Sequence, residues 1–287
     1  MNEKILIASD STSDLNPELI ERYGIKILPL GVSMGDKQYT DGVDITPEDI
    51  YENYEKTGTL PKTSAINLAA ATAFFKEHTE NGYSVVFFTI SSQMSSTYQN
   101  VHLAASEFDS VFVVDTRNLS TGGGLLVVNA CEMAAEGKTA REIVERCEAL
   151  TACVDASFVI DSLEFLRKGG RCSALAAFGA NLLGLKPCIV VRGGKMSVGK
   201  KYRGKFDVVL QKYIEDRIGD ASDIDLDRVF VTHAGCDPEI YQACVKKVKE
   251  LAPFKEVFIT RAGCTISSHC GRNTLGVLFV RKNSIQG

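Results

Sequence analysis

Hydroxyl side chains and one histidine are the residues of this chain best suited to hold an anion. They fall in two hydroxyl-rich segments, around Thr63 and around Ser95 and Ser96, and at His269, which lies among small residues. Hydroxyls and free backbone N–H groups at the ends of strands or helices can converge on a negatively charged group. We expect these segments to be loops, whose hydroxyls either converge on an anion or serve as turn and helix-capping residues.

Catalytic chemistry is the alternative for the same residues. Ser95 and His269 could form the nucleophile and base of a small-molecule hydrolase or transferase, although the chain lacks a G-x-S-x-G nucleophile elbow. Residues 194–200 fit the string G-x-x-x-x-G-K, but Lys201 stands where a hydroxyl would hold magnesium. The spacing of Asp10 and Asp14 favours a helix-capping turn over a metal site. We predict no catalytic residue, no metal site and no cofactor.

Positive charge is concentrated in residues 167–205, which hold ten basic side chains and no acidic one. The rest of the chain carries 22 basic and 36 acidic residues, a balance of −14. A segment with one sign of charge favours an anionic partner, such as a membrane surface or a nucleic acid. The net charge of −4 for the whole chain argues against nucleic acid. Inside the segment, residues 175–185 are apolar and predict a buried helix or the wall of an apolar pocket.

The elements that must position these residues follow two patterns. Up to about residue 153, short apolar runs alternate with segments of helical period, which predicts a mainly parallel sheet with helices on its faces. Capping residues followed by helix formers predict helix starts at Asn16, Thr46 and Thr139. Beyond about residue 153, strands joined by glycine-containing turns predict an α+β domain. We expect an α/β protein with an N-terminal domain at 1–153, a C-terminal domain at 154–287 and a ligand at their junction. The strands are expected at residues 5–8, 25–30, 85–90, 111–115, 158–161, 188–192, 196–198, 229–233, 257–260 and 277–280.

Cysteine usage and the N-terminal residues predict where the protein works. The nine cysteines include no Cys-x-x-Cys pair, and no leader pattern precedes the first expected strand. No apolar run approaches the ~20 residues of a membrane span. We expect a soluble cytoplasmic protein with reduced thiols.

With these residues in view, the sequence resembles the DegV family, the fatty-acid-binding proteins that work with bacterial fatty acid kinase. Three departures accompany the resemblance: 65–67 replaces Gln-Pro-Ser, Ser96 replaces a glycine, and 270–273 differs from Thr-Gly-Pro-Gly. The matching segments occur in the same order as in the family and are residues 10–15, 63–64, 91–99, 163–171, 185–187, 203–204 and 268–271.

The resemblance implies a lipid-binding protein rather than an enzyme. A long-chain fatty acid such as palmitate or stearate would lie with its tail in an apolar tunnel. Its carboxylate would be bound by Thr63, Ser95 and a network that reaches His269, and Ser96 would lie beside it. A separate ATP-using kinase subunit would phosphorylate the carboxyl group. Arg171 and Arg203 would lie near the rim and engage the kinase, the transferred phosphate or the anionic membrane surface. Their alternative role is to pair with acidic residues distant in the sequence.

Overall fold

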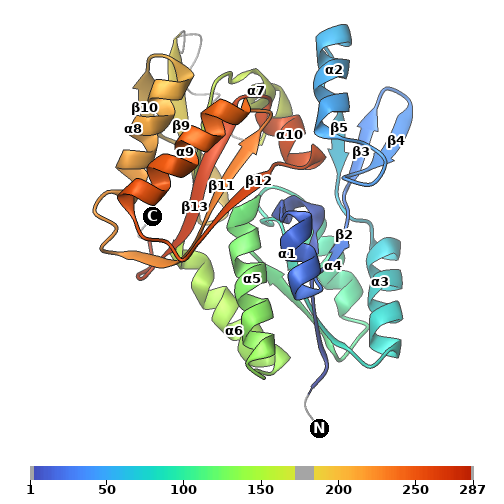
Figure 1. Ribbon diagram of the computed structural model, residues 1–287. Helices are drawn as coiled ribbons and strands as arrows, with labels where there is room; N and C mark the ends of the chain where they lie inside the picture. The colour runs from blue at the N-terminus through green and yellow to red at the C-terminus, as the bar shows by residue number, and fades with distance from the viewer. Residues whose placement is uncertain (1–2, 172–183, 286–287) are drawn as a thin grey trace.

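The structure is a computed structural model that describes residues 3–171 and 184–285. Two large sheets face each other across a layer of helices, and further helices cover the outer face of each sheet (Figure 1). The predicted α/β architecture is confirmed, with a parallel sheet in the N-terminal half and a mixed sheet in the C-terminal half.

The N-terminal sheet has four strands, all parallel, as the alternating pattern predicts. Apolar side chains alternate between its two faces, so that one face packs on α3 and α4 and the other on α1, α5 and α6. The strands in spatial order are β2 (Lys26–Leu28), β1 (Ile5–Asp10), β6 (Ser84–Thr89) and β7 (Val111–Asp115). The helices are α1 (Pro17–Tyr23), α3 (Leu68–Glu80), α4 (Thr97–Ala105), α5 (Thr121–Ala135) and α6 (Ala140–Leu150).

The three predicted helix starts are confirmed. Asn16 caps α1, and Thr139 forms a capping box with Glu142 at the start of α6. Thr46 forms a second capping box at the start of α2 (Pro47–Thr57). In each case the cap is adjacent in sequence to the helix that it starts, so the signal is local.

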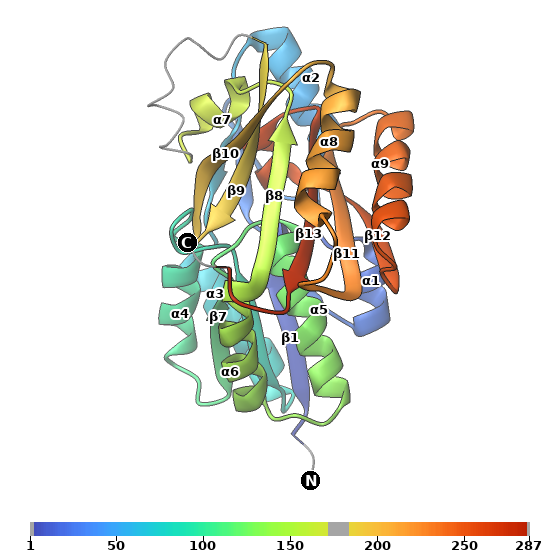
Figure 2. The same ribbon diagram turned by 90° about the vertical axis from the view of Figure 1, so that its left-hand side faces the viewer.

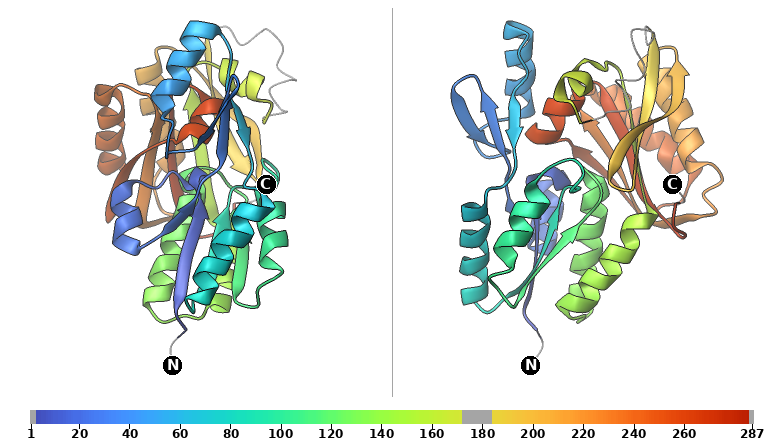
Figure 3. Two further views of the ribbon diagram at one scale, coloured as in Figure 1. Left: turned by 90° about the vertical axis from the view of Figure 1, so that its right-hand side faces the viewer. Right: turned by 180° about the vertical axis from the view of Figure 1, so that it is seen from behind.

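The protein also has a three-stranded antiparallel sheet, which the sequence patterns do not predict. It consists of β4 (Lys37–Thr40), β3 (Gly31–Met34) and β5 (Lys62–Ser64), and with α2 it projects at one end of the molecule (Figure 3). These strands have only three or four residues and mix polar with apolar side chains, so they lack the apolar runs that identify the other strands.

The C-terminal sheet has six strands and is mixed: β11 and β12 are parallel, and the other neighbours are antiparallel. Figure 2 shows most of these strands side by side. In order they are β10 (Lys195–Arg203), β9 (Leu185–Arg192), β8 (Val154–Ile160), β13 (Thr274–Arg281), β11 (Ile224–Ala234) and β12 (Glu256–Arg261). The helices of this half are α7 (Glu164–Gly169), α8 (Phe206–Ile218), α9 (Pro238–Leu251) and α10 (Cys264–Cys270). Two short 3-10 helices lie elsewhere, at Ser11–Ser13 after β1 and at Thr151–Cys153 before β8.

The largest cluster of buried apolar side chains belongs to both halves of the chain. Helix α5 supplies its centre, with strands of the parallel sheet on one side and Val154, Phe158 and Leu278 of the mixed sheet on the other. The outer face of the mixed sheet has a separate cluster beneath α8 and α9. Because the two sheets share one core, a ligand at their junction would be enclosed by both. The domain boundary at residue 153 stays a prediction.

Candidate functional site

A cavity of about 560 Å³ lies between the two sheets. Part of its wall is formed by the loops that follow the carboxyl ends of β6 and β7. Ligands of α/β proteins bind at this edge of the sheet. One set of lining side chains carries hydroxyl, amide, imidazole or guanidinium groups, and a second set is apolar. The apolar set comprises Leu30, Ile90, Met94, Leu119, Phe158, Leu166, Met196 and Ile266.

Thr63 lies in strand β5 rather than in the expected loop, which corrects the prediction for this residue. It stands opposite Val32 of β3, and its neighbour Ser64 stands opposite Gly31. A Cβ atom at position 31 would lie 2.3 Å from the Ser64 hydroxyl oxygen, so the glycine lets the Ser64 side chain keep this orientation. The small sheet therefore holds Thr63 on a fixed backbone at the cavity wall.

His269 lies in helix α10, which corrects the expectation of a loop. Two buried carboxylates from the N-terminal half accept the N–H groups at the start of this helix. Asp41 accepts from the backbone nitrogens of Cys264 and Thr265 at 2.8 and 3.1 Å, and Asp14 accepts from that of Gly263 at 2.8 Å. Because the caps come from more than 200 positions earlier in the chain, the residues next to His269 carry no helix-start signal.

The side chains of Thr63 and His269 are in contact. Oγ1 of Thr63 lies 2.9 Å from Nε2 of His269. Burial, and secondly the Arg171 guanidinium, lower the pKa of His269 to about 4, so the imidazole is neutral near pH 7. Its other nitrogen, Nδ1, is buried and has no hydrogen-bond partner within the described residues.

The proton of this neutral imidazole belongs on Nε2. A buried N–H without an acceptor is rare, and a proton on Nδ1 would be such a group. With the proton on Nε2, His269 donates to Thr63, and the hydroxyl hydrogen of Thr63 is left to donate to another acceptor. In this arrangement the Thr63 hydroxyl can donate one hydrogen bond to an acceptor in the cavity.

Gly169 closes the other side of the histidine ring. A Cβ atom at position 169 would lie 2.4 Å from Nδ1 of His269, so any larger residue would require the imidazole ring to shift. The carbonyl of Gly169 accepts from the Arg171 guanidinium at 2.8 Å. Arg171 lines the cavity and is also exposed to solvent, which places a positive charge at the cavity mouth.

Ser95 and Ser96 line the same cavity at the start of α4. The Ser95 hydroxyl lies 2.9 Å from that of Thr97 and accepts from the Thr97 backbone nitrogen at 3.2 Å. His269 contacts Thr63 and not Ser95, so the geometry offers no serine–histidine nucleophile pair. The preceding loop is held in place by Ser91, which donates to the carbonyl of Gly194 in the β9–β10 turn at 2.7 Å.

Arg203 is not among the residues that line the cavity. It ends strand β10, whereas Met196 near the start of that strand lies at the cavity wall. Seven residues of extended chain separate them by roughly 20 Å. The arginine is exposed to solvent, so the two arginines named from the sequence lie in different places.

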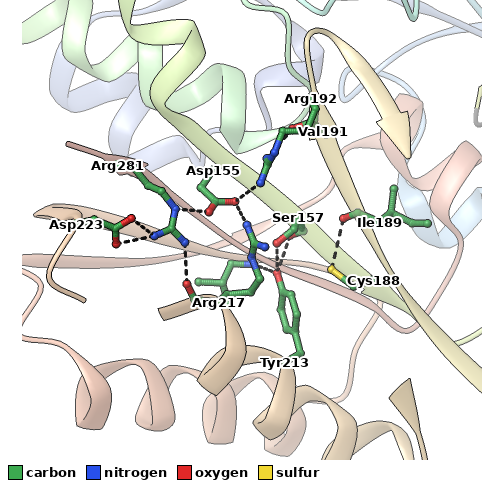
Figure 4. A network of polar contacts seen from close by, with 11 residues as sticks. Asp155, Ser157, Cys188, Ile189, Val191, Arg192, Tyr213, Arg217, Asp223 and Arg281 are labelled. Carbon is green, nitrogen blue, oxygen red and sulfur yellow. Dashed lines mark hydrogen bonds and ion pairs between the residues drawn. The ribbon is translucent and has the colours of Figure 1, made fainter. Parts of the chain in front are cut away.

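Four basic residues of the acid-free segment 167–205 pair with acidic residues outside it: Lys168, Lys186, Arg192 and Lys200. Figure 4 shows Arg192 approaching the buried carboxylate of Asp155, which Arg217 and Arg281 also contact. Arg171 forms no ion pair with a described residue. The apolar stretch 175–185 lies almost wholly outside the described residues, so its predicted role as a pocket wall stays a prediction.

The aspartates near the first strand have a structural role, as their spacing predicts. Asp10 accepts from the backbone nitrogens of Thr12 and Ile90 at 2.9 and 2.7 Å, and burial raises its pKa to about 6. Within residues 3–171 and 184–285, no group of His, Cys, Asp or Glu side chains has the arrangement of a metal site. In the same residues no helix has the length and apolar content that crossing a membrane requires.

Two residues that build the site were not singled out from the sequence. Asp41 follows strand β4 and is one of several acids in this part of the sequence, and nothing around it marks it as the cap of a distant helix. Gly169 belongs to the Gly-Gly-Arg segment that resembles the DegV family, so the resemblance is the only signal that could have found it. Its steric role becomes visible only with His269 in place.

Comparisons with known proteins agree with this architecture. The chain matches the DegV family, described as a family of uncharacterised proteins, over residues 4–282. A DegV domain-containing protein of Clostridium acetobutylicum is 31% identical over 282 residues, which cover 98% of this chain and 99% of that protein.

Solved structures of fatty-acid-binding proteins have the same fold. One is a DegV family protein from Thermus thermophilus whose structure describes fatty acid binding. Its TM-score is 0.87 at 29% sequence identity, and the match covers 97% of this chain and 99% of that one. A stearic-acid-binding protein from Eubacterium ventriosum has a TM-score of 0.84 and 27% identity, covering 97% and 98%. The match over nearly the whole chain, joined to the shared fold, shows that this protein belongs to the DegV family.

Proposed function

We propose that this chain binds one long-chain fatty acid, such as palmitate or stearate, in the cavity between its two sheets. The observation that carries the proposal is the cavity itself: hydroxyl and imidazole groups line it together with a broad apolar surface. Its volume of about 560 Å³ lies within the roughly 300–1,000 Å³ that is typical of small-molecule sites.

The tail supplies most of the binding energy in this proposal. Burial of a methylene contributes about 0.8 kcal/mol, so the palmitate tail offers roughly 12 kcal/mol before the costs of association. The carboxylate accepts hydrogen bonds from Thr63 and Ser95, with Ser96 beside them and His269 orienting Thr63. These bonds offset the cost of burying a charged group and determine which end of the lipid faces the mouth.

The bound carboxyl group is presented to a separate ATP-using kinase, which phosphorylates it. This chain acts as the carrier of the substrate rather than as the enzyme. The string G-x-x-x-x-G-K does not supply an ATP site here, because residues 195–200 lie in strand β10. The next helix, α8, begins only at Phe206, so its N–H groups do not follow the string directly as in a phosphate-binding loop. Arg171, exposed at the mouth, engages the kinase, the transferred phosphate or the anionic surface of the membrane from which lipid is exchanged.

We place this reaction in the cytoplasm. All eight cysteines among the described residues are free thiols, which is typical of a reducing compartment. No nucleic acid takes part, since the net charge of the chain is −4.

Reconstitution with purified components tests the proposed function. Chain loaded with palmitate, a bacterial fatty acid kinase and ATP should give acyl phosphate, whereas omission of either protein should give none. Hydrolysis of generic esters by the chain alone would favour an enzyme instead. Absence of acyl phosphate from the loaded chain with an active kinase would contradict the role as substrate carrier.

A further inference from the structure

A second pocket lies where the loop after β7 meets the turn between β9 and β10. It shares no lining residue with the cavity between the two sheets, so it is a separate site. Its volume of about 250 Å³ is below the roughly 300–1,000 Å³ of pockets that hold drug-sized ligands. The pocket therefore suits a small ligand.

Two arginines line this pocket, and no acidic side chain of residues 3–171 and 184–285 does. Arg117 follows strand β7, and Arg192 ends strand β9. Arg117 is exposed, and the side chain of Arg192 is 25% exposed, so solutes can reach both. Because arginine stays protonated at neutral pH, this arginine pocket is positively charged.

Both guanidinium groups keep N–H donors for a ligand. A guanidinium has five N–H groups. Nη2 of Arg117 donates to the carbonyl of Gly193 at 2.9 Å, and Nη1 of Arg192 donates to that of Val191 at 2.8 Å. Nη2 of Arg192 also lies 3.7 Å from the Asp155 carboxylate, which is longer than a hydrogen bond. Most donors of the two side chains therefore stay available.

Asp155 does not fully neutralise Arg192, because Arg217 and Arg281 bind the same carboxylate more closely. Figure 4 shows the three guanidinium groups around this one buried carboxylate. Arg281 pairs with Asp223 as well, so three arginines face two aspartates. Burial lowers the pKa of Arg192; Asp155 opposes this effect, and Arg217 and Arg281 add to it. An anion beside Arg192 would offset the surplus positive charge.

The backbone holds Arg117 toward the same turn. Its φ of 48° lies in the left-handed region, which is uncommon for residues other than glycine. Asp115 accepts from the backbone nitrogens of Arg117 and Ser92 at 2.9 and 3.1 Å. That carboxylate therefore fixes the loop, and the Arg117 guanidinium forms no ion pair with a described residue.

We propose that the arginine pocket binds a phosphate group, either free or carried by a larger solute, between Arg117 and Arg192. Guanidinium groups recognise phosphate through parallel N–H···O bonds, and two of them from different strands suit an anion with several oxygens. A phosphate monoester carries about −1.5 to −2 charge at pH 7, which a carboxylate does not match. The proposed binding of a fatty acid is not required for this inference.

Titration with inorganic phosphate at constant ionic strength, followed by amide NMR spectra, tests the proposal. The amide resonance of Gly193, whose carbonyl accepts from Arg117, should shift and saturate in wild type. Arg117→Gln and Arg192→Gln should each raise the dissociation constant about tenfold or more, because each removes hydrogen bonds to a charged group. Arg192→Gln should fold, since Arg217 and Arg281 still hold Asp155.

Arg141→Gln is the matched control. It removes the same charge from an exposed position of α6 that lines neither pocket, so phosphate should bind as in wild type. A parallel titration with ATP identifies the source of the group. Equal affinity for both probes supports free phosphate as the ligand, and tighter binding of ATP supports a phosphate carried by a larger solute.

Two results would overturn the inference. One is the absence of a saturable shift at Gly193 with either probe at millimolar concentration. The other is an unchanged dissociation constant in both folded arginine variants. Palmitate binding, measured on the same samples, is judged separately: its failure in wild type would contradict the proposed function and leave the arginine pocket unaffected.

Discussion

Thr63 and His269 are 206 residues apart in the chain, and their side chains meet at 2.9 Å between Oγ1 and Nε2. The first stands on a short strand of the small sheet, and the second on a helix capped by carboxylates of the N-terminal half. The contact therefore depends on how strand β5 and helix α10 are placed relative to each other. It also orients the hydroxyl on which the proposed headgroup site depends.

Removing the Thr63 hydroxyl should weaken lipid retention. Thr63→Val keeps the shape of the side chain and loses the donor. A hydrogen bond to a charged group is worth about 1.5–3 kcal/mol, so the dissociation constant for palmitate should rise roughly tenfold or more. Thr59→Val, at an exposed position of the same segment, is the control and should bind as wild type does. Equal affinity of Thr63→Val and wild type would remove Thr63 from the site.

A methyl group at position 169 should displace the His269 ring. Because the added Cβ would lie 2.4 Å from Nδ1, Gly169→Ala must move the imidazole and break its contact with Thr63. We expect palmitate affinity to fall about as much as in Thr63→Val. In the control, Gly123→Ala, the added Cβ meets Thr116 at an ordinary 3.4 Å inside a helix, and binding should persist. Normal affinity of Gly169→Ala would show that the ring position is unimportant.

The neutral state of His269 predicts a specific dependence on pH. Burial lowers its pKa to about 4 from the usual 6.5, so between these values the unfolded chain binds a proton that the folded chain does not. The stabilising contribution is complete above pH 6.5 and is lost as pH falls toward 4. The free energy of unfolding of wild type relative to His269→Gln should therefore decrease over this range, by about 1–3 kcal/mol.

Urea denaturation of both proteins at a series of pH values measures this difference. His233 and Asp10 also have shifted pKa values, but they are present in both proteins, and their contributions cancel in the comparison. A difference that is constant from pH 7 to pH 4 would contradict the neutral imidazole.

Arg171 and Arg203 should differ in their effects, because only Arg171 lines the cavity. Arg171→Gln should slow acyl phosphate formation by the kinase and reduce its dependence on salt, with bound lipid retained. Arg203→Gln, about 20 Å along the hairpin from the cavity wall, tests whether the second arginine of the motif also contacts the kinase. Normal phosphorylation by both variants would exclude both arginines from partner contact. Loss of lipid from Arg171→Gln with normal kinase binding would place Arg171 in the ligand site.

The sequence predicted elements whose signals are local. The helices that begin beside Asn16, Thr46 and Thr139 were found because each cap is adjacent to its helix. The buried strands were found from their apolar runs. Helix α10 was missed because Asp14 and Asp41, which cap it, lie far away in sequence.

The candidate site was predicted in part for the same reason. Residue types suggested that Thr63 and His269 serve an anion, and the family resemblance grouped them with Ser95. The residue types alone do not predict their contact, since it requires β5 to be placed beside α10; only the resemblance implied that the two side chains converge. The steric role of Gly169 likewise appears only when α7 and α10 are packed together.

The identity of the lipid that accompanies the purified protein tests the central claim most directly. Native mass spectrometry of freshly purified chain, followed by organic extraction, should yield one long-chain fatty acid for each chain. Delipidated protein should take up added palmitate to the same ratio. Recovery of a nucleotide, or of no ligand from a protein that also fails to take up palmitate, would contradict the account.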